Sequence, residues 1–323
     1  MDTLDASPVV LILFGPTASG KTSVLFELFN SAGGLQAEVV CADSMQVYRG
    51  MNIGTAKPSA RELALLPHHL IDIRDPSQQF NVGDFVRLAD EACLEIAGRG
   101  KLPVVSGGTG FYLKNLIMGL SEAPPSNREI REQLKRELKE KGSASLMEEL
   151  AAGDPVSAGR IHINDEYRLL RALEVFRFCG KPLSSFEASP QRKRNRFRFV
   201  IIGISRPREE LYRRINMRCA DMFRQGLADE VRSLYEAGYT PDDPGLRAIG
   251  YREFFTEADG EKGKWILSRD IDGVQTLVAQ NSRRYAKRQI VFFAGIPGVK
   301  WIEPGKDEAE TSQLIRAELE VFL

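Results

Sequence analysis

The sequence predicts an α/β fold, in which a parallel sheet has helices on both faces and one helical domain is inserted. Apolar runs of strand length recur between segments of helical periodicity, as at 9 to 14, 102 to 106 and 197 to 204. Glycine turns follow the first two of these runs. Strands that alternate with helices in this way pair in parallel, and ligands bind outside the carboxyl ends of the strands.

The amino-terminal part of the chain supplies three predicted strands. The run VVLILF, 9 to 14, leads through a glycine-rich turn into a helix over about 22 to 30. A second apolar run, 38 to 42, ends at Asp43, and a helical pattern from Asp84 has glycines at 98 and 100 as stop signals. The third strand, 102 to 106, enters a second glycine turn at 107 to 110. Asp43 and this turn are therefore expected at one edge of the sheet.

The middle of the chain has a different composition. Charged helix formers without a strand candidate fill the segment between Pro125 and Pro190, which predicts a helical insertion. The run FRFVIIGI, 197 to 204, returns to the sheet, and the remainder is predicted to be helical apart from a short final strand at 299 to 302. The predicted domains are a first core segment at 1–122, the insertion at 123–190 and a second core segment at 191–323.

Charge is balanced over the whole chain but locally concentrated. The 44 basic and 44 acidic residues cancel, which taken alone argues against a nucleic-acid binder. Between Arg192 and Arg218, however, ten Lys or Arg stand against two Glu, a local charge of +8. This cluster and a second one at 283 to 288 are interleaved with aromatic residues, a combination that suits RNA phosphates and unpaired bases. A solvated charged surface is the alternative for any single cation.

The cysteines and the amino terminus indicate the compartment. The four cysteines are far apart without C-x-x-C spacing, so neither a structural zinc site nor a disulfide framework is predicted. The acidic amino terminus lacks the features of a signal peptide, and no stretch reaches the length of a membrane-spanning helix. We expect a cytoplasmic protein that has no membrane association and acts as a monomer.

A phosphate-binding motif lies between the first strand and the first helix. The segment GPTASGKT matches G-x-x-x-x-G-K-[ST], the P-loop of nucleotide-binding folds, and has the strand and helix that the motif requires. Backbone N–H groups of such a loop wrap a diphosphate at a helix amino terminus, while the lysine neutralises its oxygens and the hydroxyl of Thr22 ligates Mg²⁺. The core is therefore expected to be P-loop NTPase-like, with ATP or GTP as the default ligand. The predicted diphosphate site comprises Gly15, Pro16, Thr17, Ala18, Ser19, Gly20, Lys21 and Thr22.

Several longer segments outside the P-loop carry further information about function. DSMQVYRGMNIGTAKP at 43 to 58, PHHLIDI at 67 to 73 and GGTGFYLK at 107 to 114 resemble the tRNA dimethylallyltransferase family, also called tRNA isopentenyltransferases. The resemblance continues through 164 to 184, 211 to 231, 247 to 253 and 283 to 293. It implies that the P-loop holds dimethylallyl diphosphate and that the acceptor is N6 of adenosine 37 in tRNA, beside the anticodon.

The residue types suit that chemistry. An allylic diphosphate leaves more readily when cations and a metal neutralise it, which Lys21, Mg²⁺ on Thr22 and Arg214 can do. The exocyclic amine must lose a proton, so Asp43 is a candidate general base. Asp43 also ends an apolar run, as a Mg²⁺-binding Walker B aspartate does. Thr109 resembles the family threonine near the reacting groups, although its glycine turn could simply allow close packing.

The resemblance also implies a set of tRNA contacts. Chemistry on a base in the anticodon stem-loop requires that the base be flipped into a pocket. The family commonly has Pro-Gln before the arginine at 168, whereas this chain has Glu-Tyr, so the family glutamine is not available at 167. The implied contacts are Asp43, Ser44, Met45, Gln46, Thr109, Arg131, Tyr167, Arg168, Arg171, Arg247, Ala248, Ile249, Gly250, Tyr251, Arg252, Arg283, Arg284, Lys287 and Arg288.

Two other functions fit parts of the sequence. The P-loop alone would suit a small-molecule kinase, and the P-loop with the basic clusters would suit an RNA-binding NTPase. Prenyl transfer to tRNA accounts for the P-loop, the basic clusters and the longer segments together, whereas each of the other two functions accounts for only some of them.

Overall fold

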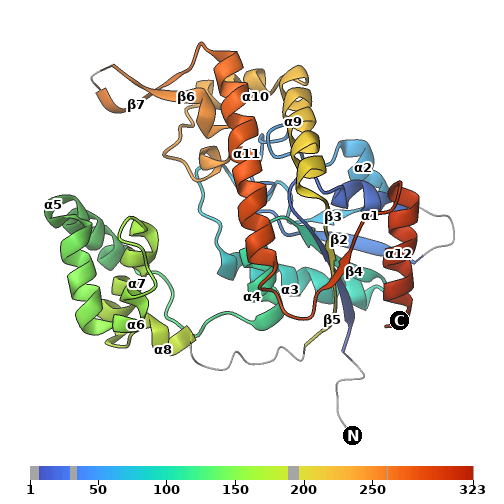
Figure 1. Ribbon diagram of the computed structural model, residues 1–323, viewed down its shortest axis with the longest axis horizontal. Coiled ribbons are helices and arrows are strands. Elements are labelled where there is room, and N and C mark those ends of the chain that lie inside the picture. The colour runs from blue at the N-terminus through green and yellow to red at the C-terminus, as the bar shows by residue number, and fades with distance from the viewer. Residues whose placement is uncertain (1–6, 30–34, 188–195, 260, 323) are drawn as a thin grey trace, which may run out of the picture. The chain divides into compact units, whose positions relative to one another are not determined.

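The computed structural model describes residues 7–29, 35–187, 196–259 and 261–322. It divides into two compact units, one formed by Met1–Ile117 with Arg194–Leu323 and the other by Met118–Lys193 (Figure 1). The sequence placed the boundaries of the inserted segment at 123 and 190. Each unit is described separately below.

The larger unit is built on a six-stranded parallel sheet. Its strands lie in the order β3-β2-β4-β1-β5-β8, and every neighbouring pair is parallel. The predicted α/β fold with a parallel sheet is confirmed. The strands are β1 (Val9–Phe14), β2 (Ala37–Cys41), β3 (His68–His69), β4 (Leu102–Gly107), β5 (Arg198–Ile204) and β8 (Lys300–Ile302).

Helices cover both faces of this sheet because alternate residues of each strand point to opposite sides. In β1, Leu11 and Leu13 join a core with α1 and α12, whereas Val10, Ile12 and Phe14 join a core with α3, α4, α9 and α11. The helices are α1 (Lys21–Phe29), α2 (Ala60–Leu65), α3 (Val82–Gly98), α4 (Gly110–Met118), α9 (Arg208–Arg224), α10 (Leu227–Glu236), α11 (Ile271–Phe293) and α12 (Glu308–Glu320), with 3-10 turns η2 (Gly245–Arg247) and η3 (Arg252–Phe254).

Helix α3 shows how local sequence sets an element. Its N-cap Asn81 accepts the N–H groups of Gly83 and Asp84, and the Asp84 carboxylate accepts the N–H of Asn81 in return. This capping box begins the helix two residues before the start expected from its apolar pattern. The apolar residues bury against the sheet, with Phe85, Ala89 and Ile96 fully enclosed.

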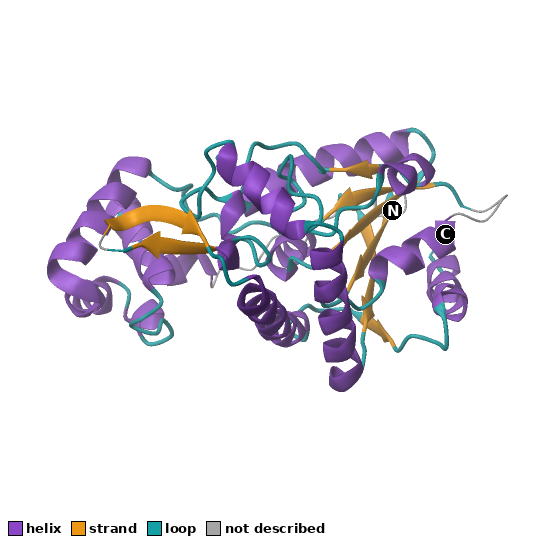
Figure 2. Cartoon of the chain, turned by 90° about the horizontal axis from the view of Figure 1, so that it is seen from above, coloured by secondary structure: helices purple, strands orange, loops and turns teal. Residues whose placement is uncertain are grey.

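The prediction of helix after β5 is wrong in one place. Strands β6 (Phe255–Ala258) and β7 (Glu261–Leu267) form an antiparallel pair separate from the main sheet (Figure 2). The Asp-Gly pair at 259 and 260 is a hairpin signal in the sequence, and aromatic and β-branched residues in the flanking segments favour strand. The two-residue strand β3 was also missed, because two residues carry no periodicity.

The smaller unit is helical in its described residues. It contains α5 (Arg128–Gly153), α6 (Pro155–Ala158), α7 (Glu166–Cys179) and α8 (Leu183–Glu187). Gly142 has a φ of 78° and interrupts α5, so that two helical segments follow each other across a kink. Leucines from α5 and α7 form its core, among them Leu134, Leu150 and Leu173.

No helix in the described ranges is both long and apolar enough to cross a membrane.

Candidate functional site

The P-loop joins β1 to α1 in the larger unit. Ala18 and Gly20 have φ values of 61° and 96°, and the N–H of Ser19 donates to the carbonyl of Pro16 at 3.1 Å. The ammonium of Lys21 donates to the carbonyls of Gly15 at 2.8 Å and Pro16 at 3.0 Å. The loop is therefore a tight turn that closes around the lysine at the start of the helix.

Two arginines donate hydrogen bonds to backbone carbonyls of this loop. Nε of Arg214, on α9, donates to the carbonyl of Ala18 at 2.9 Å, and Nε of Arg206 donates to the carbonyl of Ser19 at 2.7 Å. Because a peptide unit is planar and trans, fixing the carbonyl of Ser19 also fixes the direction of the N–H of Gly20. Arg214 thus contacts the loop backbone in this structure, and its predicted contact with the leaving group stays a prediction.

Arg218 belongs to the basic cluster of the sequence but was not predicted as a residue of the site. It follows Arg214 by four positions on α9, so both guanidinium groups lie on the face of the helix toward the P-loop. Burial, with repulsion from Arg218 second, lowers the pKa of Lys21 to about 7, although Asp43 opposes this shift. Burial also lowers the pKa of Arg218, again opposed by Asp43. Lys21, Arg218 and Asp43 line one cavity, so two basic groups and one carboxylate share a partly dehydrated site, a feature common in active sites.

Asp43 follows β2, and backbone groups orient its carboxylate. Oδ1 accepts the N–H groups of Met45 at 2.8 Å and Gln46 at 3.3 Å. Among the described residues no group donates a hydrogen bond to Oδ2, which leaves this oxygen to act as a proton acceptor or metal ligand.

Thr109 lies beside Asp43, as their positions at the ends of adjacent strands predict. Its Oγ1 accepts the N–H of Ser44 at 3.0 Å, and its own N–H donates to the carbonyl of Ala42 at 3.1 Å. A Cβ on Gly107 would lie 2.1 Å from that carbonyl oxygen, so only glycine fits there. The second glycine turn therefore allows close packing and also places a hydroxyl next to Asp43.

Gln46 has its amide engaged inside the protein. Nε2 donates to the carbonyls of Thr55 at 3.1 Å and Ala56 at 3.2 Å, while Oε1 accepts the thiol of Cys41 at 3.1 Å. A base contact from this side chain would replace one of these bonds. Gln46 thus joins the end of β2 to the segment around Thr55.

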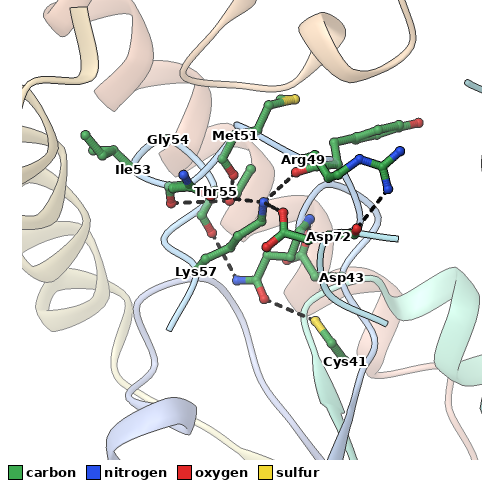
Figure 3. A network of polar contacts seen from close by, with 12 residues as sticks. Cys41, Asp43, Arg49, Met51, Ile53, Gly54, Thr55, Lys57 and Asp72 are labelled. Carbon is green, nitrogen blue, oxygen red and sulfur yellow. Dashed lines mark hydrogen bonds and ion pairs between the residues drawn. The ribbon is translucent and has the colours of Figure 1, made fainter. Parts of the chain in front are cut away.

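Lys57 fixes that segment from the other side. Its ammonium, whose side chain is only 4% exposed, donates to Asp72 Oδ1 at 2.5 Å and Asn52 Oδ1 at 3.2 Å, and also contacts the carbonyl of Tyr48 (Figure 3). This role of Lys57 was not predicted, because its partners are brought together only by the fold.

Gln289, on α11, bridges the two glycine loops and was also missed. Its Oε1 accepts the N–H of Thr17 at 2.9 Å, and its Nε2 donates to the carbonyl of Gly108 at 2.7 Å. Nearby, burial raises the pKa of Tyr285 to about 12, so its phenol stays protonated at neutral pH.

Two cavities meet at these residues. One of about 310 Å³ is polar and includes Lys21, Thr22 and Gln46 in its lining. Another of about 300 Å³ has an apolar side formed by residues of α9 and α11. Both are lined by Thr17, Thr55, Asp43, Arg218 and Tyr285. A molecule with a charged end in the first cavity and an apolar end in the second would pass beside Asp43 and Arg218.

Several predicted tRNA contacts of the larger unit line the apolar cavity or are exposed at the surface. Ser44, Met45, Arg247, Ala248, Ile249 and Arg288 line the apolar cavity together with Asp43. Arg252, Arg284, Lys287 and Arg288 are exposed, as contacts with a macromolecule require.

Three other predicted contacts have partners within the protein. Tyr251 is fully buried and donates its hydroxyl to Glu230 at 2.7 Å. The N–H of Gly250 donates to Oε2 of Glu253 at 2.9 Å, and Arg283 donates to Asn216. The hydrogen bonds of these three residues are made within the protein, and their contact with tRNA stays a prediction.

Among the predicted tRNA contacts of the smaller unit, some bond to a buried carboxylate and others are exposed. Arg131 and Arg171 donate to Glu174, which is 1% exposed, at 3.0 and 3.1 Å. Tyr167 is 72% exposed, and the Arg131 guanidinium lies 4.9 Å from its ring centroid. The exposed Arg168 pairs with Asp165 at 2.7 Å. Residues 192–195 of the basic cluster lie outside the described residues.

The fold and site together define a P-loop α/β protein in which the phosphate loop adjoins a carboxylate and an apolar cavity. The family model for IPP transferase matches residues 46–295, and the chain belongs to this family. This confirms the resemblance seen in the sequence, and the chain is therefore an enzyme of the IPP transferase family.

Relatives and solved structures match most of the length of this chain. The chain is 45% identical to the tRNA dimethylallyltransferase of Geobacter sulfurreducens, over 91% of both chains, and 40% identical to tRNA dimethylallyltransferase 1 of Syntrophotalea carbinolica, over 97% of both. The solved tRNA isopentenylpyrophosphate transferase of Bacillus halodurans matches with a TM-score of 0.65 at 35% identity, over 98% of this chain and 97% of that one. A eukaryotic dimethylallyltransferase acting on tRNA matches with a TM-score of 0.79 at 26% identity, over 98% and 79%.

Proposed function

We propose that this enzyme transfers a dimethylallyl group from dimethylallyl diphosphate to N6 of adenosine 37 in tRNA, next to the anticodon. The observation that carries the proposal is the junction of a polar and an apolar cavity at Asp43 and Arg218. This arrangement suits a donor with a diphosphate head and a short hydrocarbon tail. The names of the relatives, which are tRNA dimethylallyltransferases, support the same substrates.

The polar cavity is the site for the diphosphate. Lys21 and Arg218 supply positive charge, and the N–H groups of the P-loop supply hydrogen-bond donors. Thr22 lines the same cavity, so its hydroxyl is available to Mg²⁺. In the described residues there is no group of three or more His, Cys, Asp or Glu that could hold a metal. This suits Mg²⁺, which commonly takes one or two protein ligands and completes its shell with phosphate oxygens and water.

The transfer needs three concurrent changes. The C–O bond to the diphosphate breaks and its electron pair leaves with the diphosphate, whose charge Lys21 and Arg218 stabilise. N6 of adenosine forms the new N–C bond, and its proton moves to Oδ2 of Asp43. Since Oδ1 is held by the N–H of Met45, the orientation of Oδ2 is fixed before the substrates bind. A bound Mg²⁺ would add charge at the leaving diphosphate.

The acceptor is proposed to enter by the side of the apolar cavity that Arg247 and Arg288 line. The exposed cations Arg284, Lys287 and Arg288 of α11 suit the phosphates of an anticodon stem-loop. Arg168 and Tyr167 of the smaller unit are further contacts that the family resemblance implies. We further propose that the enzyme acts on tRNA in the cytoplasm and that it is a monomer.

The direct test uses purified protein, Mg²⁺, unmodified tRNA and radiolabelled dimethylallyl diphosphate. We expect label to appear in tRNA without ATP, and nuclease digestion to release N6-(dimethylallyl)adenosine. A tRNA with guanosine at position 37 is the control and should remain unlabelled. Strict ATP dependence with no prenyl transfer would reject the proposal in favour of a kinase or NTPase.

A further inference from the structure

The apolar side of the cavity next to Arg218 comes largely from one helix. Ile215, Cys219 and Met222 of α9 line it and are 2%, 4% and 8% exposed, and Val278 of α11 joins them. Positions three, four and seven apart lie on one face of a helix, so these residues share a face with Arg218. If the diphosphate is held by Arg218, the hydrocarbon tail of the donor extends along this face.

A further cavity adjoins this apolar face. It has a volume of about 570 Å³ and is lined mainly by the segment from Asn52 to Leu63 and by residues of α9. Of the described residues that line it and the apolar cavity, Arg218 and Met222 line both. Ile215 and Cys219, in contrast, line the apolar cavity and do not line the second cavity. Met222 is therefore the apolar residue that the walls of the two cavities share.

The helical rise between the Cα atoms of Arg218 and Met222 is comparable to the length of a five-carbon chain. Four residues of helix rise about 6 Å. A dimethylallyl group has four carbons in line beyond the ester oxygen, and with C–C bonds of about 1.5 Å it spans about 5 Å. A ten-carbon chain of about twice that length would meet Met222 when its diphosphate is held at Arg218.

We propose that Met222 sets the length of the allylic chain that the enzyme accepts. It closes the apolar cavity one isoprene unit away from the diphosphate and excludes longer prenyl diphosphates from the second cavity. This inference rests on the proposed function, because it concerns the donor of the same reaction. With a longer donor the bonds would change in the same way: the allylic C–O bond breaks, the N6–C bond forms, Asp43 takes the proton and diphosphate leaves.

The experiment compares dimethylallyl diphosphate with geranyl diphosphate as donors for tRNA. Wild-type enzyme is expected to favour the five-carbon donor strongly in kcat/KM. Met222→Ala should raise the ratio of geranyl to dimethylallyl transfer by at least about tenfold, the scale on which apolar pockets discriminate chain length. The matched control is Met217→Ala on the same helix, because Met217 is 59% exposed and does not line either cavity. Its ratio should equal that of wild type.

Each outcome has a definite meaning. An unchanged donor ratio in Met222→Ala with dimethylallyl transfer intact would overturn the role of Met222 and leave the proposed function standing. A similar gain in Met217→Ala would also overturn it, since loosening of the helix would then be the cause. If Met222→Ala does not fold, the smaller truncation Met222→Val decides by the same ratio. Absence of dimethylallyl transfer by wild-type enzyme would instead reject the proposed function.

Discussion

Tyr251 donates its hydroxyl to Oε1 of Glu230 at 2.7 Å, and the same carboxylate accepts three consecutive backbone N–H groups. These belong to Asn52, Ile53 and Gly54, at 2.9 to 3.2 Å. A Cβ on Gly54 would lie 2.5 Å from the Tyr251 ring, so the loop also depends on glycine for its approach. One side chain of α10 thereby fixes the segment whose next carbonyls, those of Thr55 and Ala56, hold Gln46.

Glu230→Gln should weaken both stability and activity. The amide keeps one acceptor oxygen but brings an NH₂ group toward backbone donors, which leaves N–H groups unpaired at a cost of about 1–3 kcal/mol. We expect this loss in urea unfolding together with a lower kcat/KM for tRNA. Asp229→Asn is the matched control, because Asp229 forms a surface ion pair with Arg232. Equal losses in the two variants would contradict a special role for Glu230.

Asp43→Asn separates the two functions that the carboxylate could have. If Asp43 is the base, turnover should fall by ~10²–10⁴-fold while donor affinity stays near that of wild type. If it instead holds Mg²⁺, donor binding should weaken and added Mg²⁺ should restore part of the rate. Single-turnover transfer and donor affinity, each measured across a magnesium titration, distinguish these cases. Rescue by Mg²⁺ would remove Asp43 from the role of base.

Donor binding should depend on pH through Lys21. Burial and the neighbouring Arg218 lower the pKa of Lys21 to about 7, so in the free enzyme its positive charge is present below pH 7 and lost above it. A diphosphate binds the charged form, and affinity should therefore fall above pH 7 by up to about tenfold per unit, with a proton taken up on binding. Calorimetry at pH 8 in two buffers of different ionisation enthalpy measures this uptake. Lys21→Arg, which stays charged, should take up fewer protons than wild type, and equal uptake would count against Lys21.

Glu38 should make the protein sensitive to acid. Burial raises the pKa of this carboxyl, but hydrogen bonds from His69, Lys101 and Arg99 outweigh it and lower the pKa to about 2. The stabilisation is thus complete above the ordinary pKa of 4.5 and is lost as the pH falls from there to 2. Glu38→Gln should lose about 3 kcal/mol at pH 7 and should flatten the pH dependence of unfolding over that range.

The control for Glu38 is Glu91→Gln, whose carboxylate is 54% exposed and pairs with Arg87. It should change the free energy of unfolding by less than about 1 kcal/mol. An equally steep acid dependence in Glu38→Gln and wild type would show that other carboxyls dominate.

Binding of tRNA should weaken with salt and with the loss of cations from α11. Arg284→Ala/Lys287→Ala removes two exposed charges, so the slope of log K against log salt should become less steep by about 1.4 to 1.8. Arg283→Ala/Arg284→Ala should also weaken binding, although Arg283 is bonded to Asn216. Filter binding from low to moderate salt measures both. Arg87→Ala on α3, an exposed arginine in a surface ion pair, is the control, and a matching change there would leave α11 without a specific role.

The P-loop, Asp43 and Thr109 could be predicted from the sequence because short segments determine where they lie. The P-loop lies between its strand and helix because glycine turns and apolar runs are short-range signals, and Asp43 and Thr109 meet because adjacent parallel strands end at one edge. The role of Arg218 could also have been predicted, since its spacing from Arg214 is one helical turn. The contact between Glu230 and the loop at 52 to 54 could not be predicted, because residues about 180 positions apart meet there only through the fold.

The parallel sheet has a consequence for how the chain folds. Strand β1, which presents the P-loop, pairs along its whole length with β5, from Val9 opposite Arg198 to Phe14 opposite Gly203. One neighbour of β1 is therefore synthesised about 190 residues after it, with the smaller unit in between. At about 5–20 residues per second, ribosomal synthesis leaves this edge of β1 unpaired for roughly 10–40 s. The P-loop is thus encoded among the first residues but is among the last parts of the molecule to acquire its native neighbours.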